Sequence, residues 1–398
     1  MNITVYPATL QGKINIIPSK SQAHRLMILA AFSGEETFLV CPQINRDMEA
    51  TAACLCALGA SISRTDKGYH VKPIRKLPDE AVLLCAESGS TLRFLLPVVG
   101  ALGIRTTFLM EGRLPCRPLS PLWEEMERMG CYLSRPTETT LLCEGKLRAG
   151  EYRIDGNISS QFITGLLLAS GLMDGETNIC IVGKLESAPY VEMTRHAMAQ
   201  FGIDTTHLKV AGAFPFSTPG TIQVEGDWSN AAFWLAANTL GSEIQVCGLA
   251  QNSPQGDRAI ADLLPRLEQH SVIDASDIPD LIPILAVTAA AKQGAVFTGI
   301  SRLRLKESDR VASTITLLEA LGGHATANEN TMSVFPCRFH GGTVNAFGDH
   351  RIAMAAAIAA TVCNAPVTIH GAEAVNKSYP SFWEEYQHLG GNYELDLR

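Results

Sequence analysis

Residues 159–171 read SSQFITGLLLASG, a pair of serines followed by an apolar run of helical length that ends at a glycine. Five other stretches share this design, and they begin at Ser21 (SQAHRLMILAAFSG), Ser90 (STLRFLLPVVGALG), Trp228 (WSNAAFWLAANTLG), Ile278 (IPDLIPILAVTAAA) and His350 (HRIAMAAAIAATV). The first four starts along the chain are 69 residues apart. Repetition at a fixed period is the signature of a repeated structural unit.

A second, amphipathic segment follows each apolar run, and most of these segments end in glycine: RDMEATAACLCALG, PLWEEMERMG, VEMTRHAMAQFG, DRAIADLLPRLEQH, DRVASTITLLEALGG and SFWEEYQHLGG. Apolar positions at i, i+3 and i+4 with a C-terminal glycine predict a helix for each. Short stretches rich in strand-forming residues lie between the helices, such as TTFLMEG, TNICIVG, SEIQVCG and APVTIHG. The sequence therefore predicts six α/β units.

One of the six units is short. Between the start of an amphipathic segment and the next apolar run, most units have about 38 to 44 residues, whereas residues 257 and 278 are only 21 apart. We expect a pair of strands to be missing near residues 269–276.

Composition limits the class of protein. A chain of 398 residues with 46% hydrophobic content can form two or more domains with substantial cores. The first residues lack an apolar signal core and no apolar run is long enough to span a bilayer, so we expect a cytoplasmic protein without membrane insertion. A formal net charge of -8 argues against a nucleic-acid-binding face. Eleven cysteines without a CxxC motif argue against a disulfide framework and a structural zinc site.

Polar and cationic residues gather at the starts of the apolar runs. The first three starts supply Lys20, Ser21 and Arg25; Gly89, Ser90 and Arg93; and Ser159, Ser160 and Gln161. Free backbone N–H groups and the helix dipole make a helix N-terminus favourable for anions. The alternative for any single serine is helix capping, but six starts in phase with cations favour binding of phosphate or carboxylate groups.

Further cations lie in four motifs: GRLPCRP (Arg113, Arg117), LRLKESDR (Arg304, Lys306, Arg310), GDHRIAM (Arg351) and NKSYP (Lys377). Charge runs are usually solvated surface. Here the basic residues alternate with serine, glycine and proline at predicted junctions between loops and helices, which favours ligand binding.

Two carboxylates accompany these cations. Glu307 lies between Lys306 and Arg310, whose charges favour its ionised form unless a bound anion offsets them. Asp280 lies at the start of the fifth apolar run, where an acid could also be a simple helix-terminal residue. His350 has a structural and a catalytic interpretation.

At these residues the sequence resembles the EPSP synthase (3-phosphoshikimate 1-carboxyvinyltransferase) family along nearly its whole length. The ordered motifs are PSKSQAHR, ESGSTLRF, CRP, SSQF, PYVEMT, EGDWSNAA, IPD, LRLKESDR, GDHRIAM and NKSYP. The resemblance implies an enolpyruvyl transferase fold with two pseudo-symmetric α/β domains, each of three βαβαββ units, and ligands in the cleft between them. It places one domain at residues 19–225 and the other at residues 1–18 plus 226–398.

The reaction that the resemblance implies moves the enolpyruvyl group of phosphoenolpyruvate to the 5-hydroxyl of shikimate 3-phosphate and releases phosphate. Neither a metal nor a cofactor is implied, and we expect a monomer whose partners are these two small molecules. Two substrates with two phosphates and two carboxylates require many fixed cations and amides.

Position by position, the resemblance implies a shikimate 3-phosphate set of Lys20, Ser21, Arg25, Ser159, Ser160, Gln161, Ser187, Tyr190, Asp280 and Lys306. It implies a phosphoenolpyruvate set of Lys20, Gly89, Arg117, Gln161, Asp280, Glu307, Arg310, Arg351 and Lys377. In the implied catalytic roles, Asp280 helps to deprotonate the 5-hydroxyl and Glu307 takes part in proton transfer at the methylene carbon. Lys20 bridges both substrates and shares in proton transfer.

Two other functions are considered. A sister family transfers the enolpyruvyl group to UDP-N-acetylglucosamine and uses a loop cysteine, which makes Cys116 relevant. In that family the cysteine lies several residues before the loop arginine, whereas Cys116 immediately precedes Arg117. A non-catalytic anion-binding scaffold is the second alternative, and retention of both Asp280 and Glu307 argues against it.

Overall fold

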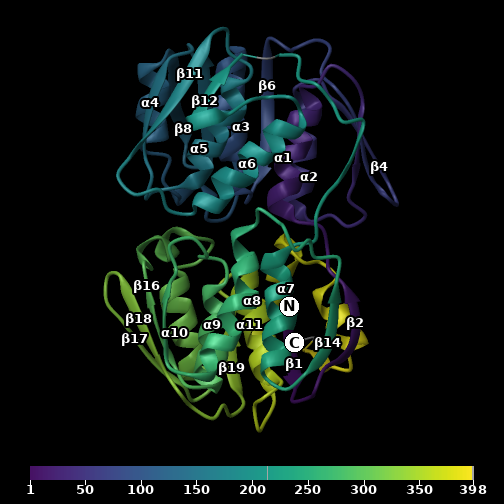
Figure 1. Cartoon of the computed structure of the whole chain (residues 1–398), viewed down its shortest axis with the longest axis vertical. Helices are drawn as coiled ribbons and strands as arrows, with labels where there is room; N and C mark the ends of the chain where they lie inside the picture. The colour runs from purple at the N-terminus through teal and green to yellow at the C-terminus, as the bar shows by residue number, and fades with distance from the viewer. Residues whose placement is uncertain (213, 397–398) are drawn as a thin grey trace. The chain divides into compact units, whose positions relative to one another are not determined.

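The computed structural model describes residues 1–212 and 214–396. Contacts within the chain divide it into two compact units (Figure 1). Unit 1 joins Met1–Ile17 to Gly226–Arg398, and unit 2 is Pro18–Glu225. Both ends of the chain belong to unit 1, because its first and last strands pair with each other in one sheet.

Three buried helices form the centre of unit 2, and they are the first three predicted apolar runs: α1 (Lys20–Ala31), α3 (Gly89–Leu102) and α5 (Ser160–Ser170). Each begins with a serine whose side chain accepts a hydrogen bond from a first-turn N–H: Ser19, Ser88 and Ser159. Capping satisfies donors that a helix start otherwise leaves without partners. Of the predicted starts, only Ser159 is a cap; Ser19 and Ser88 lie two residues before the predicted starts Ser21 and Ser90.

Unit 2 surrounds these helices with α2 (Arg46–Ala57), α4 (Leu122–Arg128), α6 (Ala188–Gln200), two short 3₁₀ helices and three sheets. The 3₁₀ helices are η1 (Leu114–Cys116) and η2 (Thr206–Leu208). The strands are β3 (Thr37–Val40), β4 (Ser61–Thr65), β5 (Gly68–Lys72), β6 (Glu80–Ala86), β7 (Arg105–Met110), β8 (Cys131–Thr137), β9 (Thr140–Gly145), β10 (Glu151–Asp155), β11 (Glu176–Val182), β12 (Lys209–Ala211) and β13 (Thr221–Gln223). The sheet orders are β13-β3-β5-β4, β6-β7-β9-β8 and β10-β11-β12.

Unit 1 has its own three buried helices, which match the other three predicted apolar runs: α7 (Trp228–Thr239), α9 (Ile282–Ala291) and α11 (His350–Ala360). The other helices are η3 (Gly256–Ala259), α8 (Ile260–Leu263), η4 (Leu264–Glu268), η5 (Ser301–Leu305), α10 (Arg310–Ala320), η6 (Ala372–Lys377) and α12 (Phe382–His388). The helix α9 begins four residues after Ile278, so Asp280 lies in the turn before it.

The sheets of unit 1 have the orders β19-β20-β1-β21, β15-β16-β18-β17 and β14-β2. Their strands are β1 (Asn2–Tyr6), β2 (Gln11–Asn15), β14 (Glu243–Cys247), β15 (Ser271–Asp274), β16 (Ala295–Thr298), β17 (His324–Ala327), β18 (Thr331–Phe335), β19 (Gly342–Asn345), β20 (Val367–His370) and β21 (Asn392–Asp396). The sheet β15-β16-β18-β17 has the same plan as β6-β7-β9-β8: a parallel pair extended by an antiparallel hairpin. The structure thus repeats one α/β unit, as predicted.

The predicted short unit is visible as the two-stranded sheet β14-β2. In the described part of the chain, η4 leads to β15 without an intervening strand pair. The side chain of Asn238 lies beside β14 instead. Its Oδ1 accepts from the Ile244 N–H at 2.7 Å and its Nδ2 donates to the Ile244 carbonyl at 2.8 Å. One amide side chain therefore satisfies both backbone groups of Ile244, as a neighbouring strand would.

The prediction of one continuous α-helix for DRAIADLLPRLEQH is wrong. The segment forms η3, a single turn of α8 and then η4, which begins beside Pro265. Proline lacks an N–H donor and its ring clashes with the preceding turn, so the α-helix stops there and continues as 3₁₀ helix.

Each unit has a separate apolar core. In unit 2 the helices α3 and α5 approach so closely that a Cβ on Gly165 would lie 2.2 Å from the carbonyl oxygen of Arg93. Only glycine permits this approach. Among the described residues, no helix combines the length and the apolar character that crossing a membrane requires.

Candidate functional site

The start of α1 carries the first predicted site residues. Lys20 Nζ forms an ion pair with Asp47 Oδ2 at 3.1 Å, and both side chains are largely buried. Asp47 comes from the first turn of α2 and was not among the predicted site residues. This pair fixes the Lys20 ammonium at the N-terminus of a helix, where an anion is also favoured.

Arg25 lies inside unit 2 with 2% of its surface exposed. Its Nε donates to Thr194 Oγ1 at 2.8 Å, and Nη2 donates to the Tyr190 carbonyl at 3.1 Å. Its Nη1 donates to the Ser21 carbonyl at 2.6 Å. The guanidinium therefore holds together the backbones of Ser21 and Tyr190, two other predicted site residues. Burial lowers the pKa of Arg25 to about 9.

The start of α3 brings two guanidiniums to one glycine. A Cβ on Gly89 would lie 2.6 Å from Arg117 Nη1 and 3.1 Å from Arg93 Nη1. The loop cation Arg117 therefore lies directly against the helix start. A glycine is needed here because any side chain would displace a guanidinium.

Gln161, in the first turn of α5, joins this group. Its Oε1 accepts from Arg93 Nη1 at 2.8 Å and its Nε2 donates to Ser90 Oγ at 3.0 Å. Ser159 caps the helix and Ser160 is buried beside it. Unit 2 thus brings Gly89, Arg117 and Gln161 together. Arg93 was noted only as a cation of the helix start, and it proves to be the link between them.

Ser187 precedes α6 with a φ of 56°, in the left-handed region, and is 1% exposed. This conformation is uncommon for a residue other than glycine and often marks a functional position. Tyr190 lies in the first turn of the same helix.

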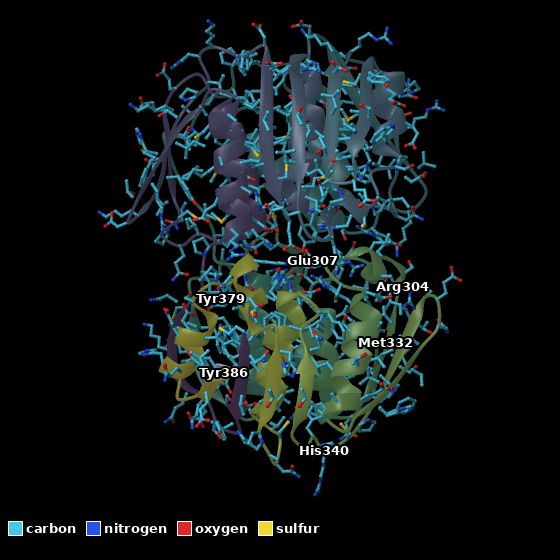
Figure 2. The ribbon with its side chains drawn as sticks, turned by 180° about the vertical axis from the view of Figure 1, so that it is seen from behind. Arg304, Glu307, Met332, His340, Tyr379 and Tyr386 are labelled. Atoms are coloured by element: carbon cyan, nitrogen blue, oxygen red, sulfur yellow. The ribbon has the colours of Figure 1, made fainter. Side chains whose placement is uncertain are left out.

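In unit 1 one partly buried charged cluster contains the predicted residues Asp280, Lys306, Glu307, Arg310 and Arg351. Arg310, with 1% of its side chain exposed, binds three carboxylates. Its Nη1 lies 2.5 Å from Asp280 Oδ1, its Nη2 lies 2.7 Å from Glu307 Oε2, and its Nε lies 2.9 Å from Asp349 Oδ2. Glu307 is labelled in Figure 2, at the end of unit 1 opposite His340.

Arg351 is the second guanidinium of this cluster. Its Nη2 donates to Asp280 Oδ2 at 2.9 Å and its Nη1 donates to the Ser229 carbonyl at 3.0 Å. The Nε of Arg351 is buried and has no hydrogen-bond partner among the described residues. Lys306 Nζ lies 4.0 Å from Asp280 Oδ1, so three cations surround one carboxylate.

These charges set the protonation states. Burial by itself raises the pKa of Asp280, but the charges of Arg351, Arg310 and Lys306 outweigh it and hold that pKa well below the usual value. Burial lowers the pKa of Lys306 to about 8, and the charge of Asp280 opposes that shift. Asp280 is therefore ionised, and a bound anion would compete with it for the same cations.

Lys377 donates from Nζ to the Gly348 carbonyl at 2.9 Å, next to the start of α11. Asp349 caps that helix, binds Arg310 and accepts from Ser308 Oγ at 3.1 Å. Asp349 belongs to the predicted motif GDHRIAM but was not among the predicted site residues. His350 is 2% exposed and lies 3.9 Å from Asp349, which agrees with its structural interpretation.

No group of three His, Cys, Asp or Glu side chains that could hold a metal ion occurs in residues 1–212 and 214–396. All eleven cysteines are free thiols, and Cys116 is exposed.

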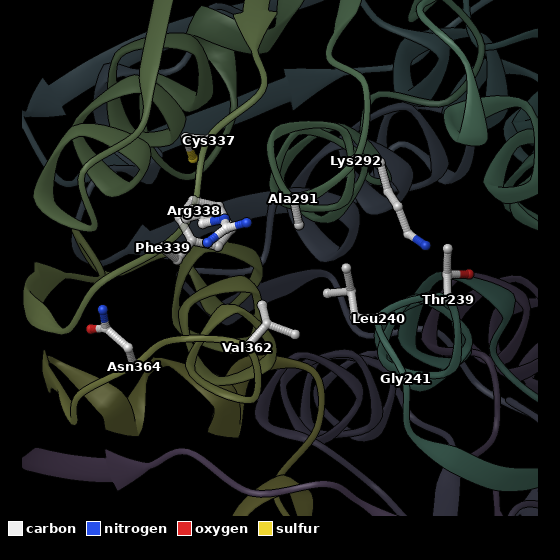
Figure 3. Close-up of a pocket in the computed structure, with 10 residues that line it drawn as sticks. All are labelled: Thr239, Leu240, Gly241, Ala291, Lys292, Cys337, Arg338, Phe339, Val362 and Asn364. Atoms are coloured by element: carbon white, nitrogen blue, oxygen red, sulfur yellow. The ribbon is translucent and has the colours of Figure 1, made fainter.

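A separate pocket of about 540 Å³ lies in unit 1 at the other ends of the buried helices (Figure 3). Its lining includes Thr239 at the end of α7, Ala291 at the end of α9 and Val362 after α11. None of the predicted site residues lines it.

A family model described as EPSP synthase (3-phosphoshikimate 1-carboxyvinyltransferase) matches residues 5–275 and 265–386. A 3-phosphoshikimate 1-carboxyvinyltransferase of Clostridium acetobutylicum is 38% identical over an alignment of 417 positions that covers 98% of this chain and 97% of the relative. One of Clostridium kluyveri is 36% identical over an alignment of 420 positions, covering 99% and 98%.

Solved structures agree on the fold. An EPSP synthase from Acinetobacter baumannii has a TM-score of 0.81 at 22% identity and covers 99% of this chain and 100% of its own. The enolpyruvyl transferase NikO from Streptomyces tendae has a TM-score of 0.76 at 17% identity, covering 99% and 98%. The predicted enolpyruvyl transferase fold is thereby confirmed.

Proposed function

The chain belongs to the EPSP synthase (3-phosphoshikimate 1-carboxyvinyltransferase) family, and on that premise we propose that it transfers the enolpyruvyl group of phosphoenolpyruvate to the 5-hydroxyl of shikimate 3-phosphate. The observation that carries this proposal is identity of 36% and 38% to curated relatives of that name over nearly the whole chain. The products are 5-enolpyruvylshikimate 3-phosphate and inorganic phosphate.

The cations of both units support binding of two multiply charged substrates. Unit 1 supplies Lys306, Arg310, Arg351 and Lys377, and unit 2 supplies Lys20 and Arg117. Fixed cations and helix N-termini stabilise anionic groups without having to reorganise during the reaction. We assign residues of both units to the same reaction.

Asp280 is the candidate base for the 5-hydroxyl. A base must be ionised before it accepts a proton, and the cations around Asp280 keep it so. They also make it a weak base. Substrate anions that bind Arg310, Arg351 or Lys306 offset these charges and raise its pKa toward the working range.

Glu307 is the candidate for proton transfer at the methylene carbon of phosphoenolpyruvate, with Lys20 as a second participant. Glu307 and Asp280 both bind Arg310, so an anion bound to Arg310 changes the pKa of both carboxylates. This coupling would let one binding event prepare both carboxylates.

The rival acceptor is UDP-N-acetylglucosamine. Exposure of Cys116 permits a role for its thiol. The names of the relatives favour shikimate 3-phosphate for this chain.

The test is a phosphate-release assay with phosphoenolpyruvate and either acceptor. We expect turnover with shikimate 3-phosphate, none with UDP-N-acetylglucosamine, and no loss of rate with a metal chelator or in the Cys116→Ser variant. Turnover with the nucleotide sugar alone would replace this proposal by the rival. Binding without turnover would support the scaffold. We also propose that the protein is a monomer, that it acts in the cytoplasm, and that it has no nucleic-acid or membrane partner.

A further inference from the structure

Asp257 is a buried carboxylate of unit 1 outside the predicted site. It lies in η3, which follows the short sheet, and only 2% of its surface is exposed. A buried carboxylate requires charged or hydrogen-bonding partners, since an isolated one is costly. Its partners lead directly to Arg351.

Ser229, in the first turn of α7, connects the two residues. Its hydroxyl donates a short hydrogen bond to Asp257 Oδ2. Its backbone carbonyl accepts from Arg351 Nη1 at 3.0 Å. Asp257 and Arg351 thus hold the same residue, one through its side chain and the other through its backbone.

The loop before Asp257 is fixed to the start of α7. Gln255 Oε1 accepts from the Trp228 N–H at 3.1 Å, and its Nε2 donates to the Gly226 carbonyl at 2.8 Å. Gln255 is itself 5% exposed. Asp257 therefore cannot turn away to solvent without breaking buried hydrogen bonds.

Three charged groups from neighbouring elements act on Asp257: Asp280 before α9, Arg351 in α11 and Asp227 at the cap of α7. Burial raises the pKa of Asp257 to about 7, Asp280 adds to this, and Arg351 and the Ser229 hydroxyl oppose it. Both protonation states are therefore populated near neutral pH.

We propose that Asp257 is a positioning residue whose charge controls how strongly Arg351 binds the anionic group of phosphoenolpyruvate. The proposal rests on the function proposed above. Ionised Asp257 and Asp280 both compete with a substrate anion for Arg351. When Asp257 is protonated, Arg351 is balanced by fewer negative charges and binds the anion more tightly.

Linkage gives the sign of the effect. A bound anion near Asp257 disfavours its ionised form and raises its pKa, so binding takes up protons near neutral pH. If binding raises the pKa of Asp257 by one unit, the affinity for the anion is about tenfold weaker well above pH 7 than well below it.

The experiment is isothermal titration calorimetry of the full chain with phosphoenolpyruvate at about pH 6, 7 and 8. Buffers of different ionisation enthalpy report the protons taken up. The variants are Asp257→Asn, which keeps the shape and a hydrogen-bond acceptor, and Asp262→Asn, a matched control on the exposed side of the same segment. Protons that the substrate itself exchanges cancel in the comparison with the parent chain.

We expect Asp257→Asn to take up fewer protons and to bind more tightly than the parent chain at the highest pH, by about threefold to tenfold. Asp262→Asn should match the parent chain. Proton uptake and a pH profile of affinity equal to those of the parent chain would, for Asp257→Asn, overturn the proposal.

If Asp257→Asn fails to fold, Ser229→Ala provides the test. Loss of the Ser229 hydroxyl raises the pKa of Asp257, so the pH at which phosphoenolpyruvate binding weakens must become higher. An unchanged pH for this weakening would also overturn the proposal.

Phosphate release separates this proposal from the proposed function. Proton-linked binding that depends on Asp257, without phosphate release from shikimate 3-phosphate mixtures, would support the role of Asp257 and contradict the reaction. Normal turnover with proton uptake that is independent of Asp257 would support the reaction and contradict the role of Asp257.

Discussion

Asp280 and Arg310 form a short, partly buried ion pair, with Oδ1 of the carboxylate 2.5 Å from Nη1 of the guanidinium. The same guanidinium binds Glu307 and Asp349, and the same carboxylate binds Arg351. The two carboxylates proposed for proton transfer therefore share one cation. Any anion that binds this cation changes the basicity of both.

Replacing Asp280 with asparagine should reduce kcat by about a hundredfold to ten-thousandfold, because the proposed base is lost while the shape is kept. The measurement is steady-state phosphate release at saturating substrates. The exposed acid Glu319 provides the control, and Glu319→Gln should be unaffected. An Asp280→Asn variant with kcat near that of the parent chain would rule out Asp280 as the base.

Arg310→Lys should destabilise the fold as well as the reaction. A lysine has one ammonium and cannot bind one buried and two partly buried carboxylates in the geometry of the guanidinium. Loss of a partner from a buried ion network costs about 3–5 kcal/mol in the free energy of unfolding. Urea unfolding of Arg310→Lys and of the more exposed Arg304→Lys would measure it. Equal stability of the two variants would contradict the network.

The KM for shikimate 3-phosphate should rise as the pH passes about 8. The pKa of Lys306 is lowered to about 8, so the free protein loses this positive charge above that pH, while the substrate phosphate keeps its charge. Lys306→Arg remains protonated and should lack this rise. The pH profile of KM for both chains tests this, and a rise of equal size in the variant would exclude Lys306 as its source.

Gly89→Ala should raise the KM for phosphoenolpyruvate, because its Cβ would displace Arg117 from the start of α3. The control is Gly34→Ala, where the nearest atom would be 3.6 Å from the new Cβ. We expect little change in the melting temperature of either protein. An unchanged KM in Gly89→Ala would show that phosphoenolpyruvate binding does not depend on the position of Arg117 at the start of α3.

Asn238→Ala should lower the free energy of unfolding by about 1–3 kcal/mol, since both backbone groups of Ile244 lose their partner beside the short sheet. The exposed Asn364 provides the matched control, Asn364→Ala. Unfolding by urea gives the difference. Equal values would mean that water replaces the amide without cost.

The sequence predicted the repeated unit and the six buried helices because their pattern is local: a polar start followed by a run of apolar residues. The short unit was predictable from spacing alone. The break at Pro265 was missed, because the amphipathic pattern of that segment continues past the proline and outweighed it in the prediction. Asn238 could not have been assigned a role, since its partner Ile244 becomes important only when the neighbouring strands are absent.

For the site, the sequence predicted the cations and two of their carboxylate partners, Asp280 and Glu307, but not the other acids near them. Asp47, Asp257 and Asp349 all meet their cations from other elements, so their roles depend on tertiary structure. Arg25 is a predicted cation whose protein partners could not be read from the sequence. It was predicted as a substrate ligand, which stays a prediction, but its N–H groups also bind Thr164, Thr194 and the Tyr190 carbonyl, which come from distant positions in the chain.

The central claim is tested most directly by phosphorus NMR of a mixture of the purified protein, phosphoenolpyruvate and shikimate 3-phosphate. We predict that the phosphoenolpyruvate signal disappears, that inorganic phosphate appears in equal amount, and that the shikimate 3-phosphate signal shifts to that of its 5-enolpyruvyl ether. Unchanged signals, or phosphate release that leaves shikimate 3-phosphate unmodified, would contradict the claim.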